Sequence, residues 1–289
     1  MKLKGMDKLR GKLPGYPGKR IFLLPLRGLV GAVLAYSFLI FLDILPRLFP
    51  DIAFLVLLEP ILPILGSLVI GALAVSLIAM IWKKRDPMKV EYGDLAYQKV
   101  IPKGVMGVMM IPSVVFHAAT SIRSLPPVLP VNDLTTQFSQ SLLPLLGITG
   151  DLDILIRLAL AGFFAIVGML VIRSSILTFG IDYMTVVYLY FPEESEIQEH
   201  EIYSIVRHPA YMSGVILGGA AMFFRCSVYS ILIFLIAYLI FKVHIRREEA
   251  ELIDRFGEGY REYKQKVPGL YVRPRDLMTF IRFLFTKPS

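Results

Sequence analysis

Long apolar runs separated by short charged segments dominate the chain. A helix needs about 20 largely apolar residues to cross a bilayer, so runs of this length predict membrane spans. Pro60 and Pro63 predict a kink or a late start in the second run. The expected spans are residues 21–42, a segment starting between 53 and 61 and ending at 82, and residues 104–122, 154–179, 209–224 and 228–243. The fold class is therefore all-α: a multi-pass transmembrane helical bundle of about six spans, the last two forming a hairpin.

Composition agrees with this pattern. The chain has 289 residues, of which 55% are hydrophobic and 19% charged, whereas soluble domains are about 45–50% apolar and about 25% charged. Its net charge of +8 sits in segments that flank the apolar runs, a position typical of contacts with lipid headgroups rather than nucleic acid. Cys226 is the only cysteine, which excludes an intrachain disulfide.

The distribution of charge predicts topology. Residues 1–20 carry seven basic and one acidic residue, and residues 83–103 carry six basic and three acidic. The loop 123–153 carries one basic and three acidic residues. The positive-inside rule therefore places both basic segments in the cytosol, and the parity of the spans adds residues 192–208 and 244–289. We expect an integral membrane protein with cytosolic N- and C-termini. Residues 183–191 are too short to span, and we expect them at the interface or in a re-entrant segment.

A first polar motif, Tyr-x-x-x-Arg-His-Pro-x-Tyr-x-x-Gly, opens the predicted hairpin at residues 203–214. Pro209 favours a strand-like approach followed by a helix start. Arg207 and His208 then lie beside free backbone N–H groups, which suits an anion such as a carboxylate. Gly214 allows a ligand to approach the backbone closely. Alternatively, Arg207 and His208 simply anchor the helix among the headgroups.

A second motif follows the hairpin: Glu248-Glu249, then Phe-Gly-x-x-Tyr-x-x-Tyr and Val-Pro, up to residue 268. Adjacent helical residues point about 100° apart, so we expect one glutamate to face the bundle and the other to face water. A solvated charge run, or an amphipathic helix on the headgroups, is the alternative.

A hairpin returns the chain to the same face of the membrane, so the two motifs should form one site. Cationic and anionic groups would lie side by side there, against apolar walls. S-Adenosylmethionine offers matching groups: a carboxylate, an ammonium, a sulfonium and an adenine. Tyr203 and Tyr211 would flank its adenine or, by cation–π attraction, its sulfonium.

Together, the two motifs resemble the isoprenylcysteine carboxyl methyltransferase and phospholipid methyltransferase superfamily of integral membrane methyltransferases, over about residues 195–270. The resemblance implies a cofactor pocket closed by a cytosolic helical tail, and a lipid substrate that enters sideways from the bilayer. It also implies that S-adenosylmethionine contacts Tyr203, His208, Pro209, Ala210, Tyr211 and Glu248. Arg207, Gly214 and Glu249 are added because the two motifs place them at the same site. The candidate cofactor-binding residues are therefore Tyr203, Arg207, His208, Pro209, Ala210, Tyr211, Gly214, Glu248 and Glu249.

The chain departs from the family pattern one helical turn before the glutamates. His244 stands where the carboxyl methyltransferases have an arginine for the substrate carboxylate, and Arg246 and Arg247 follow. These three are the candidate substrate-side residues. Residues 1–150 would form an N-terminal transmembrane region of about three spans, and residues 151–289 the methyltransferase core.

The predicted activity is methyl transfer to a membrane-embedded acceptor, most simply carboxyl O-methylation of the isoprenylcysteine type. The alternatives are N-methylation of a phospholipid or other lipid amine, an NADPH-dependent sterol-type reductase, and a non-enzymatic membrane protein. The partners are the membrane and a lipid or lipidated substrate, with no nucleic acid, and nothing in the sequence specifies an oligomer. The four histidines lie in separate segments without the short spacing of metal ligands, so no metal is expected.

Overall fold

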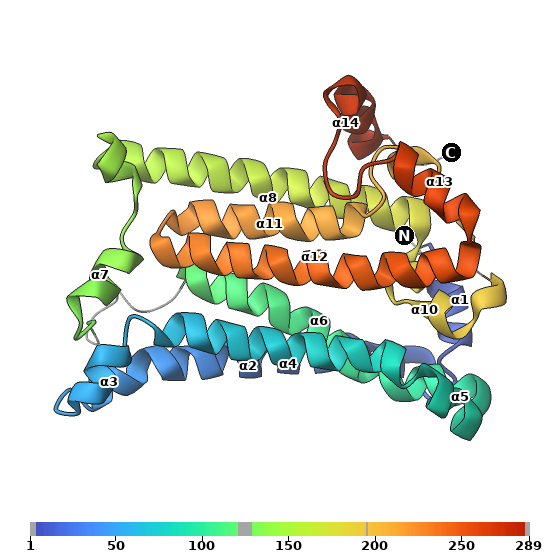
Figure 1. Ribbon diagram of the computed structural model, residues 1–289, viewed down its shortest axis with the longest axis horizontal. Helices are drawn as coiled ribbons and strands as arrows, with labels where there is room; N and C mark the ends of the chain where they lie inside the picture. The colour runs from blue at the N-terminus through green and yellow to red at the C-terminus, as the bar shows by residue number, and fades with distance from the viewer. Residues whose placement is uncertain (1–3, 121–128, 195, 287–289) are drawn as a thin grey trace.

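The computed structural model describes residues 4–120, 129–194 and 196–286, and within these ranges the chain is helical without strands (Figure 1). Five segments in this part of the chain are long and apolar enough to cross a membrane. They are Gly18–Leu48 (containing α2, Leu23–Leu48), Leu62–Lys83 (α4), Arg85–Thr120 (containing α5, Arg85–Tyr92, and α6, Ala96–Thr120), Asp151–Phe179 (α8) and Val228–Phe256 (α12). The prediction of a multi-pass helical bundle is confirmed.

The sixth expected span is α11 (Pro209–Arg225), a helix of 17 residues. At 1.5 Å per residue it is about 25 Å long, a little less than the roughly 30 Å of a bilayer core. Cys226 adopts a left-handed conformation at its end, and Ser227 caps α12 through a reciprocal capping box with Ser230. The sequence thus forms the expected hairpin, with α11 and α12 side by side (Figure 1).

Two helix boundaries differ from the predicted spans. Helix α6 begins at Ala96, earlier than expected, and residues 121–122 of the predicted span lie outside the described residues. Helix α12 continues past residue 243 to Phe256 without interruption. Glu251 and Arg255 support this extension through an i,i+4 ion pair of 2.9 Å, and Gly257, with φ of +60°, ends it. The hairpin's second helix therefore continues beyond the predicted span of residues 228–243 and carries the second motif.

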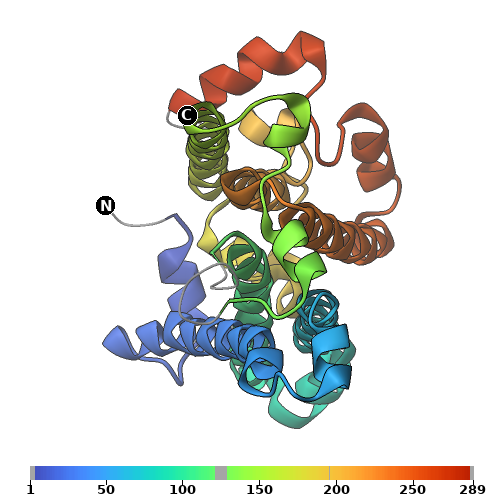
Figure 2. The same cartoon turned by 90° about the vertical axis from the view of Figure 1, so that its left-hand side faces the viewer.

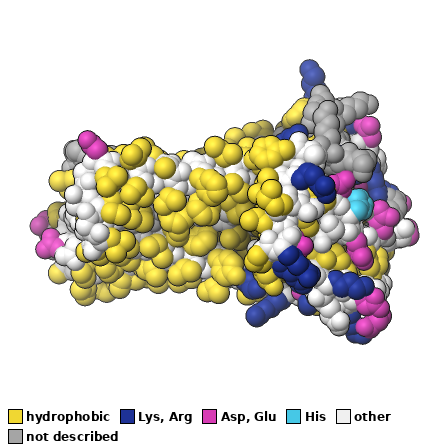
Figure 3. All heavy atoms as spheres, turned by 90° about the horizontal axis from the view of Figure 1, so that it is seen from above, with side chains coloured by type: hydrophobic (Ala, Val, Ile, Leu, Met, Phe, Trp, Pro, Cys, Tyr) yellow, Lys and Arg dark blue, Asp and Glu magenta, His cyan; other side chains and the backbone are white. Residues whose placement is uncertain are grey.

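The bundle has a charged end and a less charged one. Figure 3 shows hydrophobic side chains along the bundle and Lys, Arg, Asp and Glu gathered mainly at the end that holds α5 and α13. The short helices at that end are α1 (Met6–Gly11), α5 (Arg85–Tyr92), α9 (Ile181–Met184), α10 (Val187–Tyr190), α13 (Glu258–Lys266) and α14 (Leu277–Phe285). Helices α3 (Ala53–Leu58) and α7 (Asp133–Ser139) lie at the other end. The described parts of both basic segments and of the C-terminal tail thus share one end, as the parity argument requires, and its assignment to the cytosol stays a prediction.

Two groups of helices make up the bundle. Helices α2, α4 and α6 pack together, α8 packs on α11, and α6 and α12 join the groups (Figure 2). Buried Ala74 and Val114 of the first group share a core with Ile233 of α12. Within the first group, His117 Nε2 lies 2.9 Å from Asp43 Oδ2, both fully buried, which agrees with the tendency of intramembrane polar groups to pair inside a bundle.

The expected interfacial or re-entrant position of residues 183–191 stays a prediction, and the structure shows what the segment packs against. They lie at the charged end, largely within α9 and α10, with Val187, Tyr188 and Tyr190 buried in a core shared with Leu9 and Tyr97. The segment is therefore a packed part of the charged end of the bundle.

Gly107 sets how closely α4 and α6 approach, because a Cβ there would lie 2.7 Å from the backbone oxygen of Ala74. We expect Gly107→Ala to lower the free energy of unfolding by about 1–3 kcal/mol, through the overpacking it forces. The unfolding midpoint of the detergent-solubilised protein measures this. Gly162→Ala is the matched control, since nothing lies within 4 Å of that position. Equal midpoints for the two variants would contradict this account of the α4–α6 contact.

Candidate active site

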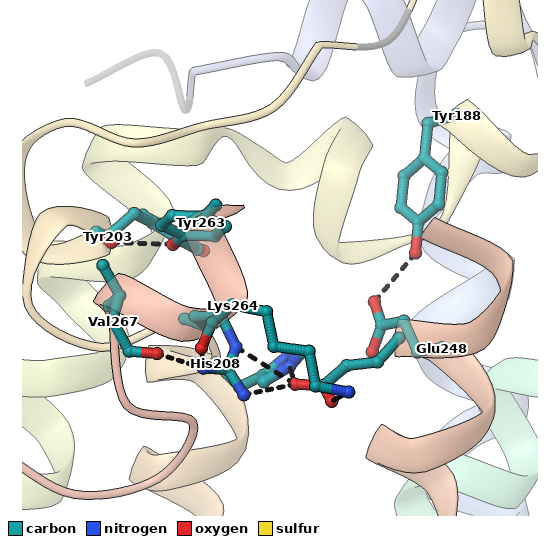
Figure 4. Close-up of polar contacts among 9 residues, drawn as sticks. Tyr188, Tyr203, His208, Glu248, Tyr263, Lys264 and Val267 are labelled. Carbon is teal, nitrogen blue, oxygen red and sulfur yellow. Dashed lines mark hydrogen bonds and ion pairs between the residues drawn. The ribbon is translucent and has the colours of Figure 1, made fainter. Parts of the chain in front are cut away.

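An ion-pair cluster joins the two sequence motifs at the charged end of the bundle. Arg207 Nη2 lies 2.7 Å from Glu249 Oε1, and His208 Nε2 lies 3.0 Å from the same oxygen. Lys264 of α13 lies 2.8 Å from Glu249 Oε2 (Figure 4). With 6% of its surface exposed, Glu249 is buried, and three cationic or hydrogen-bonding partners offset the cost of removing its charge from water.

The tail is fastened to the Arg-His-Pro turn by further hydrogen bonds. Arg207 Nη1 donates to the carbonyl oxygens of Lys264 (2.8 Å) and Val267. The backbone N–H groups of Arg207 and His208 donate to the carbonyls of Pro268 (2.9 Å) and Gly269 (3.1 Å). We expected an extended, strand-like segment before Pro209. Only Arg207 and His208 pair in this way, because residues Glu201–Ser204 form a 3₁₀ helix instead.

Glu248 has different surroundings from its neighbour. Its Oε1 accepts a hydrogen bond of 2.8 Å from the Tyr188 hydroxyl (Figure 4). Its Oε2 is buried and forms no hydrogen bond of normal geometry among the described residues, although the Tyr211 phenol interacts with the same carboxylate. An ionised carboxylate oxygen in this state is costly, so the arrangement suits a cationic or hydrogen-bond-donating ligand.

The expectation that one glutamate faces water is wrong. Glu248 is half-buried and Glu249 buried, because α13 folds back across the end of α12 and the Arg207 turn meets it from the other side. The rotation of about 100° between neighbours instead directs Glu249 to the ion-pair cluster and Glu248 to a cavity.

This cavity has a volume of about 420 Å³, within the usual range of roughly 300–1,000 Å³ for ligand sites. Its polar end is lined by the residues Tyr188, Tyr203, Arg207, His208, Glu248, Tyr260 and Tyr263. Its apolar walls come from both helix groups: Val75 and Ile78 of α4, Val108 and Pro112 of α6, and Ile240 of α12. Val75 lies seven residues, about 10 Å along the helix, from Trp82 at the charged end, so the cavity extends from that end into the interior of the bundle.

Tyrosines dominate the polar end and remain neutral. Burial raises the pKa of the Tyr203, Tyr260 and Tyr263 phenols well above their usual value. Burial, reinforced by the adjacent Glu248 charge, does the same to the pKa of Tyr188. Each therefore stays protonated at neutral pH, and Tyr188 can act only as the donor toward Glu248.

The structure brings together most, but not all, of the candidate cofactor residues. The cavity is lined by Tyr203, Arg207, His208, Pro209, Ala210, Tyr211, Gly214 and Glu248. A Cβ on Gly214 would lie 3.1 Å from the Phe241 ring, itself part of the wall. Glu249 does not line the cavity but holds Arg207 and His208 in place. The cations expected to bind a carboxylate are thus already paired within the protein.

The three substrate-side candidates lie in different surroundings. His244 lines the cavity and makes edge-to-face contacts with Trp82 (ring centroids 5.1 Å apart) and Tyr211 (5.6 Å). Arg246 and Arg247 are exposed on α12 and do not line it.

Sequence reasoning missed several cavity residues that carry polar groups, among them Tyr188 and Trp82. Tyr188 lies in a segment with no helical periodicity to indicate which face is buried. It is positioned by Arg255, which donates 3.1 Å to the Tyr188 carbonyl oxygen. Trp82 ends a predicted span next to lysines, a position typical of membrane-interface anchors, and this concealed its place in the cavity wall.

Comparison with known proteins agrees with the resemblance. The model of the isoprenylcysteine carboxyl methyltransferase (ICMT) family matches residues 160–254. Two relatives from Oryza sativa (subsp. indica and subsp. japonica), each described as a probable protein-S-isoprenylcysteine O-methyltransferase, are 28% identical over 103 residues, 35% of this chain and 54% of theirs. The protein-S-isoprenylcysteine O-methyltransferase of Schizosaccharomyces pombe is 38% identical over 68 residues, 23% of this chain and 29% of its own. No solved structure shows a significant match.

These findings confirm the superfamily indicated by the two motifs. The chain spans about half the length of the rice relatives it matches, and the matched region covers α11 and most of α8 and α12.

The two glutamates should differ in their effect on stability. We expect Glu249→Gln to lower the free energy of unfolding by about 3 kcal/mol, because it leaves Arg207 and His208 buried without a counter-charge. Glu248→Gln keeps an oxygen for the Tyr188 hydroxyl and should change stability by less than about 1 kcal/mol. Unfolding midpoints of the two purified variants test this, and similar losses in both would contradict the division of roles.

Proposed function

We propose that this chain, whose residues 160–254 match the isoprenylcysteine carboxyl methyltransferase family, is a membrane enzyme that transfers a methyl group from S-adenosylmethionine to a lipid acceptor. The acceptor group proposed is the carboxylate of an isoprenylated cysteine, because the matching family is described as a carboxyl methyltransferase and the names of the relatives state isoprenylcysteine. The observation that carries the proposal is the Glu248 carboxylate, which accepts from Tyr188 on one oxygen and forms no hydrogen bond of normal geometry on the other, in a cavity walled by tyrosines and apolar side chains.

The polar end of the cavity fits the proposed cofactor. Glu248 Oε2 forms no hydrogen bond of normal geometry among the described side chains, and it would accept a hydrogen bond from the ammonium or a ribose hydroxyl. The rings of Tyr203, Tyr211 and Tyr260 line the same end, and such rings attract a sulfonium through their faces and stack with an adenine. S-Adenosylmethionine, when bound, supplies a methyl group activated by the positive sulfur to which it is attached.

The protein's own contribution is positioning and exclusion of water. The cluster formed by Arg207, Glu249 and Lys264 fixes the tail across the polar end, and Tyr263 fastens it further by donating 2.7 Å to the Tyr203 carbonyl. Apolar walls formed by α4, α6 and α12 would hold the lipid chain. A carboxylate nucleophile needs no general base, so alignment and desolvation account for the catalysis that the residues supply.

A lipid amine is the second candidate acceptor, and the charge inside the cavity favours it. Among the described lining residues the only guanidinium is that of Arg207, which is paired with Glu249. The wall therefore offers a carboxylate acceptor no unpaired arginine, whereas a neutral amine needs none.

The linkage formed distinguishes the two acceptors. Membranes containing the protein, incubated with methyl-labelled S-adenosylmethionine and N-acetyl-S-farnesylcysteine, should form a labelled product that releases volatile methanol in base, as methyl esters do. Label that stays bound in base, with phosphatidylethanolamine as acceptor, would establish the amine reaction instead. Transfer to neither acceptor would contradict the proposed function.

Glu248→Gln should weaken S-adenosylmethionine binding by about tenfold or more, because it removes a charge-assisted hydrogen bond worth about 1.5–3 kcal/mol. The rise in melting temperature with added cofactor measures this. Glu258→Gln, which changes an exposed glutamate on α13 paired only with Arg261 among the ion pairs described, is the control and should bind normally. A rise with NADPH but not with S-adenosylmethionine would favour a reductase.

A further inference from the structure

Trp82 is the only tryptophan of the chain, and its place in the sequence is typical of a membrane-interface anchor. It lies at the end of α4, directly before Lys83 and Lys84. Tryptophans at this level of a membrane helix usually sit among the headgroups, with the ring against lipid and the indole N–H in water. That role would require an exposed nitrogen.

The structure shows a different arrangement. Trp82 Nε1 is buried and has no hydrogen-bond partner among the described residues, while the residue lines the cavity. An indole nitrogen can only donate, and an unsatisfied buried donor costs about 1–3 kcal/mol. The nitrogen is therefore better suited to a ligand in the cavity than to an anchor in the headgroups.

The surroundings of Trp82 indicate which ligand it meets. Its ring contacts His244 edge-to-face at 5.1 Å, and Glu248 follows one helical turn later on α12, at the polar end. On the other side, Val75 and Ile78 of the same helix line the apolar part. Trp82 therefore lies between the end proposed for the cofactor and the part proposed for the lipid chain, where the headgroup of an acceptor would lie.

We propose that Trp82 donates its indole N–H to an oxygen of the acceptor headgroup, and that the acceptor is a lipid bearing an anionic oxygen there. The proposal rests on the proposed function. It places a specificity-determining residue in the N-terminal region, outside the residues matched by the family model. Because Arg207 is occupied by Glu249, neutral donors such as the Trp82 N–H, together with His244, are available to recognise such an oxygen beside Glu248. Both a lipid-linked carboxylate and a phospholipid phosphate provide one.

Fluorescence of the unmodified protein tests the contact directly, because all tryptophan emission comes from Trp82. Three probes are added to the detergent-solubilised protein: N-acetyl-S-farnesylcysteine, its carboxamide and phosphatidylethanolamine. A saturable change in emission with the acid but not with the carboxamide identifies a carboxylate, and a change with the phospholipid alone identifies a phosphate. Equal changes with acid and carboxamide, or no change with any probe, would overturn the proposal.

Trp82→Phe keeps a ring and removes the donor. We expect KM for the acceptor to rise about three- to tenfold, as for loss of one hydrogen bond, while the cofactor-induced rise in melting temperature is retained. Tyr97→Phe is the matched control, since it removes a buried hydroxyl that donates 2.9 Å to the Thr185 carbonyl at the same end without lining the cavity. It should leave KM unchanged.

The outcomes separate this proposal from the one on which it rests. Wild-type methyl transfer with an unchanged acceptor KM in Trp82→Phe would overturn the role of Trp82 and leave the proposed function standing. Equal increases in KM in Trp82→Phe and Tyr97→Phe would also overturn the role of Trp82, because they would indicate a general loss of packing at this end of the bundle. A wild-type protein that neither binds S-adenosylmethionine nor transfers methyl groups would overturn both.

Discussion

The ion pair between Arg207 and Glu249, 2.7 Å long, determines the shape of the whole charged end. It joins the turn before α11 to the extension of α12, and Lys264 adds α13 to the same carboxylate. Tyr260, Tyr263 and Val267 also pack against Leu252 and Phe256. The hydrophobic effect has no direction, however, so the ion pair and the hydrogen bonds around it fix which polar groups meet. Buried charges are costly, but a fully paired cluster specifies one arrangement.

Once that pair is formed, the geometry of α12 fixes the directions in which the neighbouring side chains point. Glu248 precedes Glu249 by one position and so points about 100° away, into the cavity. His244 precedes Glu248 by about one turn and lines the same cavity. Glu249 thus holds the tail in place, while Glu248 keeps an oxygen for a ligand. Both roles depend on α12 continuing as one helix beyond residue 243 to Phe256.

The spans and the approximate place of the site could be predicted from the sequence, for physical reasons. Span positions follow from apolar run length, and the approach of the Arg-His-Pro motif to the paired glutamates follows from the parity of a hairpin. The pairing of Arg207 with Glu249 in particular did not follow from the sequence. The direction of each glutamate did not follow, because it depends on α13 packing back over α12. Tyr188 and Trp82 could not be found, since the pattern around them reports burial or interface position and says nothing of a cavity formed between distant helices. Residues 1–150 matched no motif, yet α4 and α6 supply much of the apolar wall.

The contribution of α4 and α6 bears on how a lipid and a polar cofactor could share one cavity. The matched region, residues 160–254, supplies most of the polar end. The apolar wall deeper in the cavity is formed by α4 and α6. These two helices approach closely at Gly107, where an added Cβ would lie 2.7 Å from the backbone oxygen of Ala74. Polar recognition is thus carried by short motifs with fixed spacing, whereas holding an apolar chain requires only suitable volume and hydrophobic surface, which many sequences provide. This difference explains why the second half of the chain carries the recognisable motifs and the first half does not.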